Sequence, residues 1–463
     1  LLSVSLSACA TMAPEYRRLE TPTPTAVYGS AESAEAVSLV SWREVFIDPA
    51  LQRIIETALD NNRDLRIATL NVERARELYR VRRADLLPEI GGEAGYARQR
   101  IGENAASGML GAPSGAGALT TEQYSVNASI SAYELDLFGR VRSLNRQALE
   151  IYFAAEETRK AAEISLIAEI ASAYLQLAAD RVLLALANDT VQSQSESLDL
   201  TQQLVAHGLG NDLDVQRART TLERARADAA ALEAQVERDE NALRLLVGAA
   251  DYNPKSDAPF IDDIVMRRSP PSNLHSETLL ARPDVLAAEN RLKAANANIG
   301  AARAAFFPKI LLTARAGTAS VELDDLFSGG TGVWSFAPSI SVPIFTGGRN
   351  RAQLAAAKID REIAQAEYER AIQAAFRDTA DALATRRTIQ RQLEATENLA
   401  DAAAQTYALA EARFRNGIDG YLALLDAQRS NYAARQDLIS ARLAEAANVV
   451  SLYRALGGEA PAR

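Results

Sequence analysis

The chain has 463 residues, of which 48% are hydrophobic and only 6% aromatic, and its formal net charge is -10. An acidic chain with scattered Lys and Arg lacks the basic surface that binds a phosphate backbone, so we expect no nucleic-acid partner. One cysteine and two histidines exclude an intrachain disulfide framework and leave almost no ligands for zinc or haem. We therefore expect neither a metal site nor a cofactor.

The first feature along the chain is the motif Leu6-Ser7-Ala8-Cys9, which follows an apolar stretch and is typical of a bacterial lipobox. In this interpretation residues 1–8 are the remnant of a signal peptide, and Cys9 carries a diacylglyceryl group. Two or more acyl chains give stable anchoring in a membrane. The alternative is a chance cysteine in an unstructured terminus, because the initiating Met and a basic leader are missing.

An internal duplication organises the rest of the chain. Pro88 and Pro308 each end a predicted helix and precede a predicted strand, at an offset of about 220, whereas the segments 207–209 and 416–418 correspond at an offset of about 209. The change in offset predicts an insertion within Ile101–Thr121, since loop tips tolerate length changes. A duplicated unit is the simplest interpretation.

Each unit is predicted to run as helix, two strands, long helix, tight turn and helix. The expected helices span about 49–87, 140–206, 212–247, 277–307, 349–415 and 421–456. A heptad seam follows the first long helix, at Leu166, Ile170, Ala173, Leu177, Asp180, Leu184, Ala187, Val191, Gln194 and Leu198. At about 1.5 Å per residue, each long helix would reach roughly 100 Å. A plain helical bundle would fit this pattern as well as a tunnel does.

The predicted strands favour a membrane barrel. Apolar residues alternate with small polar residues along Tyr124–Ala132 and Ser335–Ile344, the outward and inward pattern of an outer-membrane strand. The segments Glu89–Arg98 and Lys309–Ala319 alternate less regularly. A soluble sheet covered by helices is the alternative. Because a membrane barrel needs at least eight strands, one chain supplies only part of one and must oligomerise.

No helix is expected to span a membrane. The most apolar helical segment, residues 161–187, is interrupted by Glu163, Glu169, Asp180 and Arg181. A spanning helix needs roughly 20 nearly uncharged residues.

Ordered sequence motifs on the duplicated frame resemble the TolC-like outer membrane factor family, in its NodT/OprM-type lipoprotein branch. The resemblance covers nearly the whole chain, and together its motifs are specific. They are Trp42-Arg43-Glu44-Val45-Phe46, Asp48-Pro49-Ala50-Leu51, Asn61-Asn62-Arg63-Asp64-Leu65, Ala281-Arg282-Pro283-Asp284-Val285, Val342-Pro343-Ile344-Phe345, Gly347-Gly348-Arg349, Arg415-Asn416-Gly417 and the segment from Tyr421 to Arg429.

The resemblance implies a mainly α fold with a small β part. Three chains would form an α-helical barrel, a coiled-coil tunnel, continued by a 12-stranded β-barrel with four strands per chain. The expected layout is signal remnant 1–8, lipidated extended segment 9–48, first repeat 49–248, equatorial linker 249–276, second repeat 277–458 and tail 459–463.

The implied function is the exit duct of a tripartite efflux system of the RND type, as a homotrimer in the outer membrane that extends into the periplasm. Its partners would be outer-membrane lipid, a periplasmic adaptor and an inner-membrane pump. By the same resemblance, Leu422, Asp426 and Arg429 would form the periplasmic gate. The adaptor-docking tips would be His207, Gly208, Leu209, Asn416, Gly417 and Ile418.

Other functions have less support in the sequence. No Walker loop, dinucleotide fingerprint or nucleophile with plausible partners indicates an enzyme. A periplasmic coiled-coil scaffold would need no lipid-facing strands, and a conduit of type I secretion would share the same tunnel. The gate is expected to be asymmetric, because the first unit has Leu213, Arg217 and Thr220 at the aligned positions.

Overall fold

The computed structural model describes residues 11–18, 22–24, 39–102, 118–253, 264–265, 276–458 and 460–461. Cys9 and most of the predicted insertion and linker lie outside these residues. The chain divides into two compact units. The sheet unit comprises Leu1–Leu19, Glu73–Ala154 and Glu289–Glu367, and the hairpin unit comprises Glu20–Val72, Ala155–Ala288 and Tyr368–Arg463.

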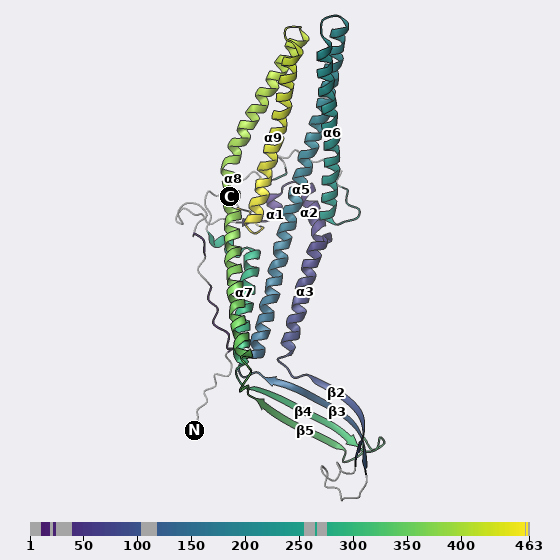
Figure 1. Ribbon diagram of the computed structural model, residues 1–463, viewed down its shortest axis with the longest axis vertical. Coiled ribbons are helices and arrows are strands. Elements are labelled where there is room, and N and C mark those ends of the chain that lie inside the picture. Colours follow the sequence, from purple (N-terminus) through teal and green to yellow (C-terminus); the bar gives the residue numbers. More distant parts are fainter. Residues whose placement is uncertain are drawn as a thin grey trace. The chain divides into compact units, whose positions relative to one another are not determined.

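Two long antiparallel helical hairpins dominate the hairpin unit (Figure 1). Hairpin one consists of α5 (Arg140–Ala206) and α6 (Asp212–Val247), and hairpin two of α8 (Arg349–Arg415) and α9 (Tyr421–Ala455). The long helices α5 and α8 both have 67 residues. The predicted positions of these four helices are confirmed to within one residue.

The main core of the hairpin unit forms around α2 (Pro49–Asn61), where α5, α6 and α9 pack together. Its fully buried side chains include Leu51, Ile55, Ile170, Leu175 and Leu243. Shorter elements in this unit are α1 (Trp42–Val45), the 3-10 helix η3 (Ser276–Ala281), and the strand pair β1 (Leu39–Val40) and β6 (Ala460–Pro461).

Several motif residues hold this core together. Phe46 meets Tyr453 edge to face, with ring centroids 5.4 Å apart. The carboxylate of Asp48 accepts the Ala50 N–H at the start of α2 and also the Tyr174 hydroxyl, at 2.8 Å each. An acidic N-cap satisfies one of the free N–H groups of the first helical turn.

The first predicted helix, 49–87, is wrong in one respect, because it breaks at Asn62 into α2 and α3 (Arg63–Ala84). The Asn62 side chain accepts the Leu65 N–H and donates to the Leu246 carbonyl at the end of α6. A side chain that caps both a new helix and a neighbouring helix end favours a break over a continuous helix.

The first helix of the second sequence repeat breaks at the equivalent residue. The predicted helix 277–307 consists of η3 followed by α7 (Pro283–Ala304), and Arg282 stands between them. Arg282 donates to the Ala455 carbonyl at 2.6 Å. Arg282 is 220 positions after Asn62, and Ala455 is 209 positions after Leu246, so these pairs are equivalent in the two repeats. The duplicated junctions therefore bond equivalent carbonyls with different side chains.

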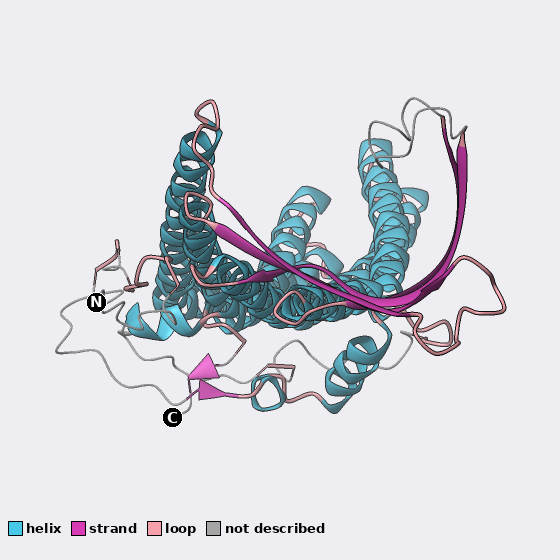
Figure 2. Ribbon diagram, turned by 90° about the horizontal axis from the view of Figure 1, so that it is seen from below, coloured by secondary structure: helices cyan, strands magenta, loops and turns pink. Residues whose placement is uncertain are grey.

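The sheet unit contains four antiparallel strands in the order β2 (Ile90–Ile101), β3 (Leu119–Leu135), β4 (Lys309–Ser320) and β5 (Gly332–Ser341). They lie side by side and curve together (Figure 2). The register shifts between Ile130 and Tyr133, where Ala132 has a φ of 53°, and this bulge interrupts the predicted alternation of β3.

The fourth strand ends earlier than predicted, at Ser341 rather than Ile344. Its last pairing is between Ser341 and Lys309. Pro343 has no N–H to donate to the ladder, so the strand stops before it. The apolar residues that follow, Ile344 and Phe345, are 95% and 90% exposed.

Among the described residues, one helix, α5, contains an 18-residue window that is long and apolar enough to cross a membrane. The expectation that the charges of this helix exclude an apolar window is therefore wrong, as judged by length and composition alone. Within the structure 56% of that window is buried, which is the behaviour of a core helix.

Candidate functional site

The turns at the two hairpin tips have the same backbone. Gly208 has a φ of 73° and Gly417 a φ of 71°. The Leu209 N–H donates to the Leu204 carbonyl at 2.8 Å, and the Ile418 N–H donates to the Arg413 carbonyl at 2.9 Å. With the glycine N–H groups bonded one turn back, both ends are Schellman motifs, which need a residue that tolerates positive φ.

All six predicted tip residues are exposed in the structure. Leu209 is 75% exposed and Ile418 61% exposed, so each tip presents one large apolar side chain to solvent. His207 and Asn416 precede the two glycines. This arrangement leaves the tips free to make contacts.

The side chains that support the two turns differ. In hairpin one, the Asn211 side chain accepts the Asp214 N–H at 3.0 Å and caps α6, while Arg217 pairs with Asp214 at 3.2 Å. In hairpin two, Gly420 begins α9 without a side-chain cap.

The second turn is instead closed by an ion pair. Arg413 and Asp419 form a two-contact pair, with nitrogen to oxygen distances of 2.5 and 3.0 Å. The Arg413 guanidinium holds the pKa of the Asp419 carboxyl below its ordinary value. One tip therefore relies on a helix cap and the other on a surface ion pair.

An apolar cluster joins the two hairpins near the tips. It consists of Leu198, Ala218, Leu222, Phe414, Tyr421, Leu424 and Leu425. Tyr421 is 3% exposed and meets Phe414 edge to face at 5.9 Å. Leu198 belongs to the predicted heptad seam. The α9 members of the cluster were not predicted as contacts, although their spacing is that of a buried helical face.

The three predicted gate residues lie on an exposed face of α9 that borders its buried face. Leu422, Asp426 and Arg429 are exposed, with Leu422 at 61%. Their spacing of four and three residues places them on one stripe of the helix. On α6 the aligned Leu213 is 57% exposed, and Arg217 is engaged with Asp214.

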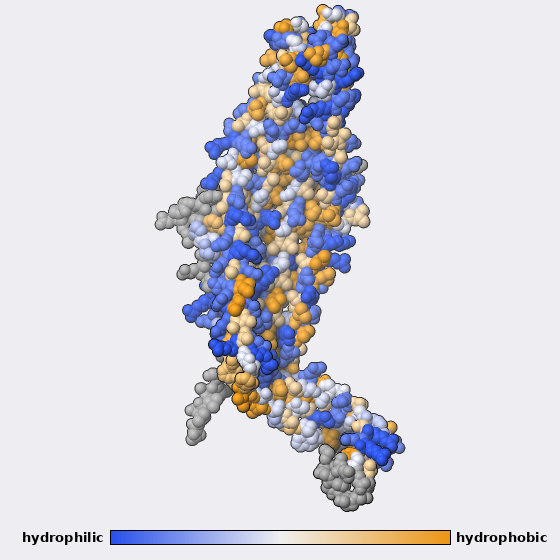
Figure 3. Space-filling model, in the orientation of Figure 1, coloured by the Kyte–Doolittle hydropathy of each residue, from blue (hydrophilic) through white to orange (hydrophobic). Residues whose placement is uncertain are grey.

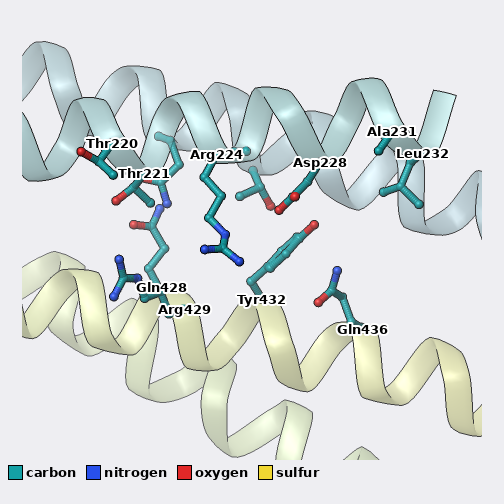
Figure 4. A pocket seen from close by; sticks show the side chains of 13 residues that line it. Thr220, Thr221, Arg224, Asp228, Ala231, Leu232, Gln428, Arg429, Tyr432 and Gln436 are labelled. Carbon is teal, nitrogen blue, oxygen red and sulfur yellow. The ribbon is translucent and has the colours of Figure 1, made fainter. Parts of the chain in front are cut away.

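Beyond the apolar cluster, a cavity of about 680 Å³ separates α6 from α9, and the predicted gate residue Arg429 is among its lining residues (Figure 4). Arg224 and Asp228 of α6 and Tyr432 of α9 point into it. Burial raises the pKa of Tyr432, and the nearby charge of Asp228 adds to the rise. The amide oxygens of Gln194 and Gln428 are buried without a partner. At this level, therefore, the hairpins touch through a small apolar contact that lies next to a cavity.

The sheet unit has a different surface. On β5, Trp334, Phe336 and Ile340 share one face and are 80%, 61% and 67% exposed. On the face drawn in Figure 3, apolar residues gather where the strands join the helices of this unit. No group of three or more His, Cys, Asp or Glu side chains suited to a metal occurs in the part of the chain that the structure describes.

A family comparison identifies the arrangement. Residues 54–249 and 274–458 match the family described as Outer membrane efflux protein. The chain belongs to this family. The resemblance expected from the motifs is therefore confirmed. The family is one of efflux channels and not of enzymes.

Named relatives agree with this assignment to the outer membrane efflux protein family. Toluene efflux pump outer membrane protein TtgC and antibiotic efflux pump outer membrane protein ArpC, both of Pseudomonas putida, are each 43% identical over 99% of this chain and 95% of the relative. The open-state Neisseria gonorrhoeae MtrE outer membrane channel has a TM-score of 0.86 and 38% identity, over 97% of this chain and 98% of that one. The TolC-like fold, the outer-membrane location and the role as an efflux duct are confirmed.

Proposed function

We propose that three copies of this chain form the exit duct of a tripartite efflux system of the RND type. The observation that carries the proposal is the open, four-stranded sheet, which has an exposed apolar face and two edge strands, β2 and β5, exposed along their length. Long free edges are normally paired or covered. Three such sheets would close a 12-stranded barrel that satisfies every edge in lipid.

The duct would be passive and without catalysis. The periplasmic part would be the helical barrel built from six hairpins, and the repeats 49–248 and 277–458 would each contribute one hairpin and two strands per chain. Relatives are named for toluene and antibiotics, so we propose small organic molecules as the exported class. Selectivity would lie mainly in the inner-membrane pump.

A lipid on Cys9 would tether the duct to the outer membrane. The support is the lipobox sequence alone. Twelve lipid-facing strands bury far more apolar surface than the acyl chains, so Cys9→Ser should abolish acylation and leave an inserted trimer. Mass spectrometry of the wild-type chain without lipid, or loss of insertion in the variant, would contradict these two expectations.

The tips would dock the periplasmic adaptor. Exposed apolar side chains at Leu209 and Ile418 stand on turns with the same hydrogen-bonded backbone, which is the kind of surface that a helical partner can cover. His207, Gly208, Asn416 and Gly417 would complete the contact.

Leu422, Asp426 and Arg429 would form the gate where three α9 helices approach one axis. Three carboxylates about 8 Å apart would repel by about 0.5 kcal/mol per pair in water and about 2 kcal/mol at an effective dielectric constant near 20. A closed ring would therefore attract cations, with Leu422 as the apolar plug. Because α6 has Arg217 where α9 has Asp426, only hairpin two would carry the acid.

The test is the conductance of the reconstituted protein in planar bilayers. Asp426→Ala, alone or with Leu422→Ala, should raise the conductance and abolish block by multivalent cations. Arg217→Ala, at the aligned position of hairpin one, is the matched control and should preserve the block. If both gate variants match the wild type in conductance and block, the constriction lies elsewhere.

A further inference from the structure

Hairpin one contains a pair of neighbouring carboxylates that no part of the proposed duct uses. Asp180 of α5 is 5% exposed, and it faces Asp239 of α6. The Oδ2 atom of Asp239 is fully buried and has no hydrogen-bond partner. Two ionised carboxylates are both pure acceptors, so neither can satisfy the other unless one of them holds a proton.

The remaining contacts of the pair are neutral. Gln176 donates its amide to Asp180 at 2.9 Å, and Gln235 donates to Asp239 at 2.8 Å. Burial raises the pKa of Asp239 to about 6, and the Asp180 carboxylate beside it adds to the rise. Gln235 and the charge of Arg238 oppose the rise only in part.

Charged groups on the surrounding helices are committed elsewhere. Arg181, next to Asp180, pairs with Glu240 at 3.0 Å. On α9, Arg442 and Glu445 pair with Glu397 and Arg386 of α8, at 3.4 and 3.5 Å. From α2, the buried carboxylate of Asp48 binds the Tyr174 hydroxyl. These ion pairs direct the cations to other carboxylates, and Arg238 is the cation whose charge acts on Asp239.

Hairpin two lacks this chemistry at the equivalent level. An offset of 209 positions takes Asp180 to Ile389 and Asp239 to Asn448. Ile389 is 3% exposed, and Asn448 donates its amide to the Ala382 carbonyl at 2.9 Å. Neither side chain titrates, so the second hairpin is an internal reference for the first.

We propose that Asp180 and Asp239 form a proton-operated latch, which tightens α5 against α6 when the periplasm becomes acidic and has no counterpart in hairpin two. With one proton bound, one carboxyl donates to the other across the two helices. With none bound, the buried Asp180 carboxylate and the partly buried Asp239 carboxylate repel, and the pair weakens the hairpin at this level.

The direction of the effect follows from linkage. The pKa of Asp239 in the folded hairpin, about 6, lies above its ordinary value of 3.8. The stabilising contribution of the bound proton is therefore complete below about pH 4 and is lost as the pH rises through about 6. Since this rests on the hairpin alone, it does not depend on the proposed gate or partners.

Hydrogen exchange of the full-length protein in detergent tests the latch, with rates corrected for the intrinsic pH dependence of amide exchange. Peptides covering residues 174–186 and 233–245 should be protected up to about tenfold more at about pH 5 than at about pH 7.5. Partial exposure of the pair to solvent reduces this factor, with about threefold as the lower expected limit. Peptides covering 383–395 and 442–454 should show no such change.

Asp239→Asn should remove the pH step and give the acid-state protection at both pH values, because its amide can donate to Asp180 without a proton. Asp180→Asn should remove the step in the same way, so either folded variant is sufficient. Glu237→Gln removes an exposed carboxylate from the same helix and should keep the step. An equal change in both hairpins, no change in hairpin one, or a step that survives in the Asn variants or disappears in Glu237→Gln would overturn the latch.

Discussion

The two hairpins share a backbone and differ in their polar side chains. Both tips end in a Schellman motif around a glycine with φ near 70°. At the far end of each hairpin, a side chain bonds to the carbonyl at the equivalent position of α6 or α9. Between these ends the buried polar groups are unrelated. After the duplication, the two hairpins retained the backbone conformation of their turns and junctions, whereas their buried polar side chains diverged.

The clearest difference between the buried side chains of the two hairpins lies about one helical turn away from the level of Asp180 and Asp239. Hairpin two buries the ion pair of Arg386 and Glu445, with side chains 7% and 10% exposed. The equivalent positions of hairpin one hold Leu177 and Val236. A buried ion pair is costly to break on one side only, but apolar residues of similar size can replace both partners together.

The largest expected effect comes from this ion pair. Glu445→Ala should lower the free energy of unfolding by about 3 to 5 kcal/mol, because it removes one partner of a buried ion pair. The double variant Arg386→Leu with Glu445→Val copies hairpin one and should be neutral or more stable by about 1 to 4 kcal/mol. Denaturant unfolding followed by circular dichroism measures both. A double variant as unstable as the single one would mean that the pair is essential to hairpin two.

The tip glycines should respond alike. Gly208→Ala and Gly417→Ala each force an alanine into positive φ and should each cost about 1 to 2 kcal/mol. A Cβ at either position meets no atom within 4 Å, so backbone strain is the whole effect. Hydrogen exchange of the turn and the last turn of the preceding helix reports the loss.

Gly420 provides the control for the tip glycines. Its φ is -78°, which alanine adopts freely, so Gly420→Ala adds no backbone strain and should cost only about 0.5 to 1 kcal/mol, because alanine is a weaker N-cap than glycine. Unequal losses at Gly208 and Gly417 would show that the surrounding side chains, and not the shared backbone, decide the turn.

The smallest effect distinguishes the caps. Asn211→Ala removes the only side-chain cap of α6 and should cost about 1 kcal/mol, whereas Gly420→Asn should stabilise the start of α9 by a few tenths of a kcal/mol. Amide exchange in the first turn of each helix measures the two changes. A gain at Gly420 as large as the loss at Asn211 would mean that the Arg413–Asp419 pair contributes little to that turn.

The sequence determined the features that depend on local chemistry. Helix periodicity located α5, α6, α8 and α9, and the requirement for positive φ located the turns at Gly208 and Gly417. Alternation located the strands, although Pro343 ended the last one three residues early.

Tertiary structure decided the features that depend on long-range contacts. Helix propensity runs through Asn62, and the local cap of the Leu65 N–H is joined there by a bond to the carbonyl of Leu246, 184 positions away, which periodicity does not reveal. The heptad seam placed Asp180 on the face that meets a partner helix, but periodicity does not tell which residue it meets. That the partner is Asp239, a second acid, follows only from the register in which α6 folds back on α5, because hairpin packing fixes that register across many apolar contacts at once.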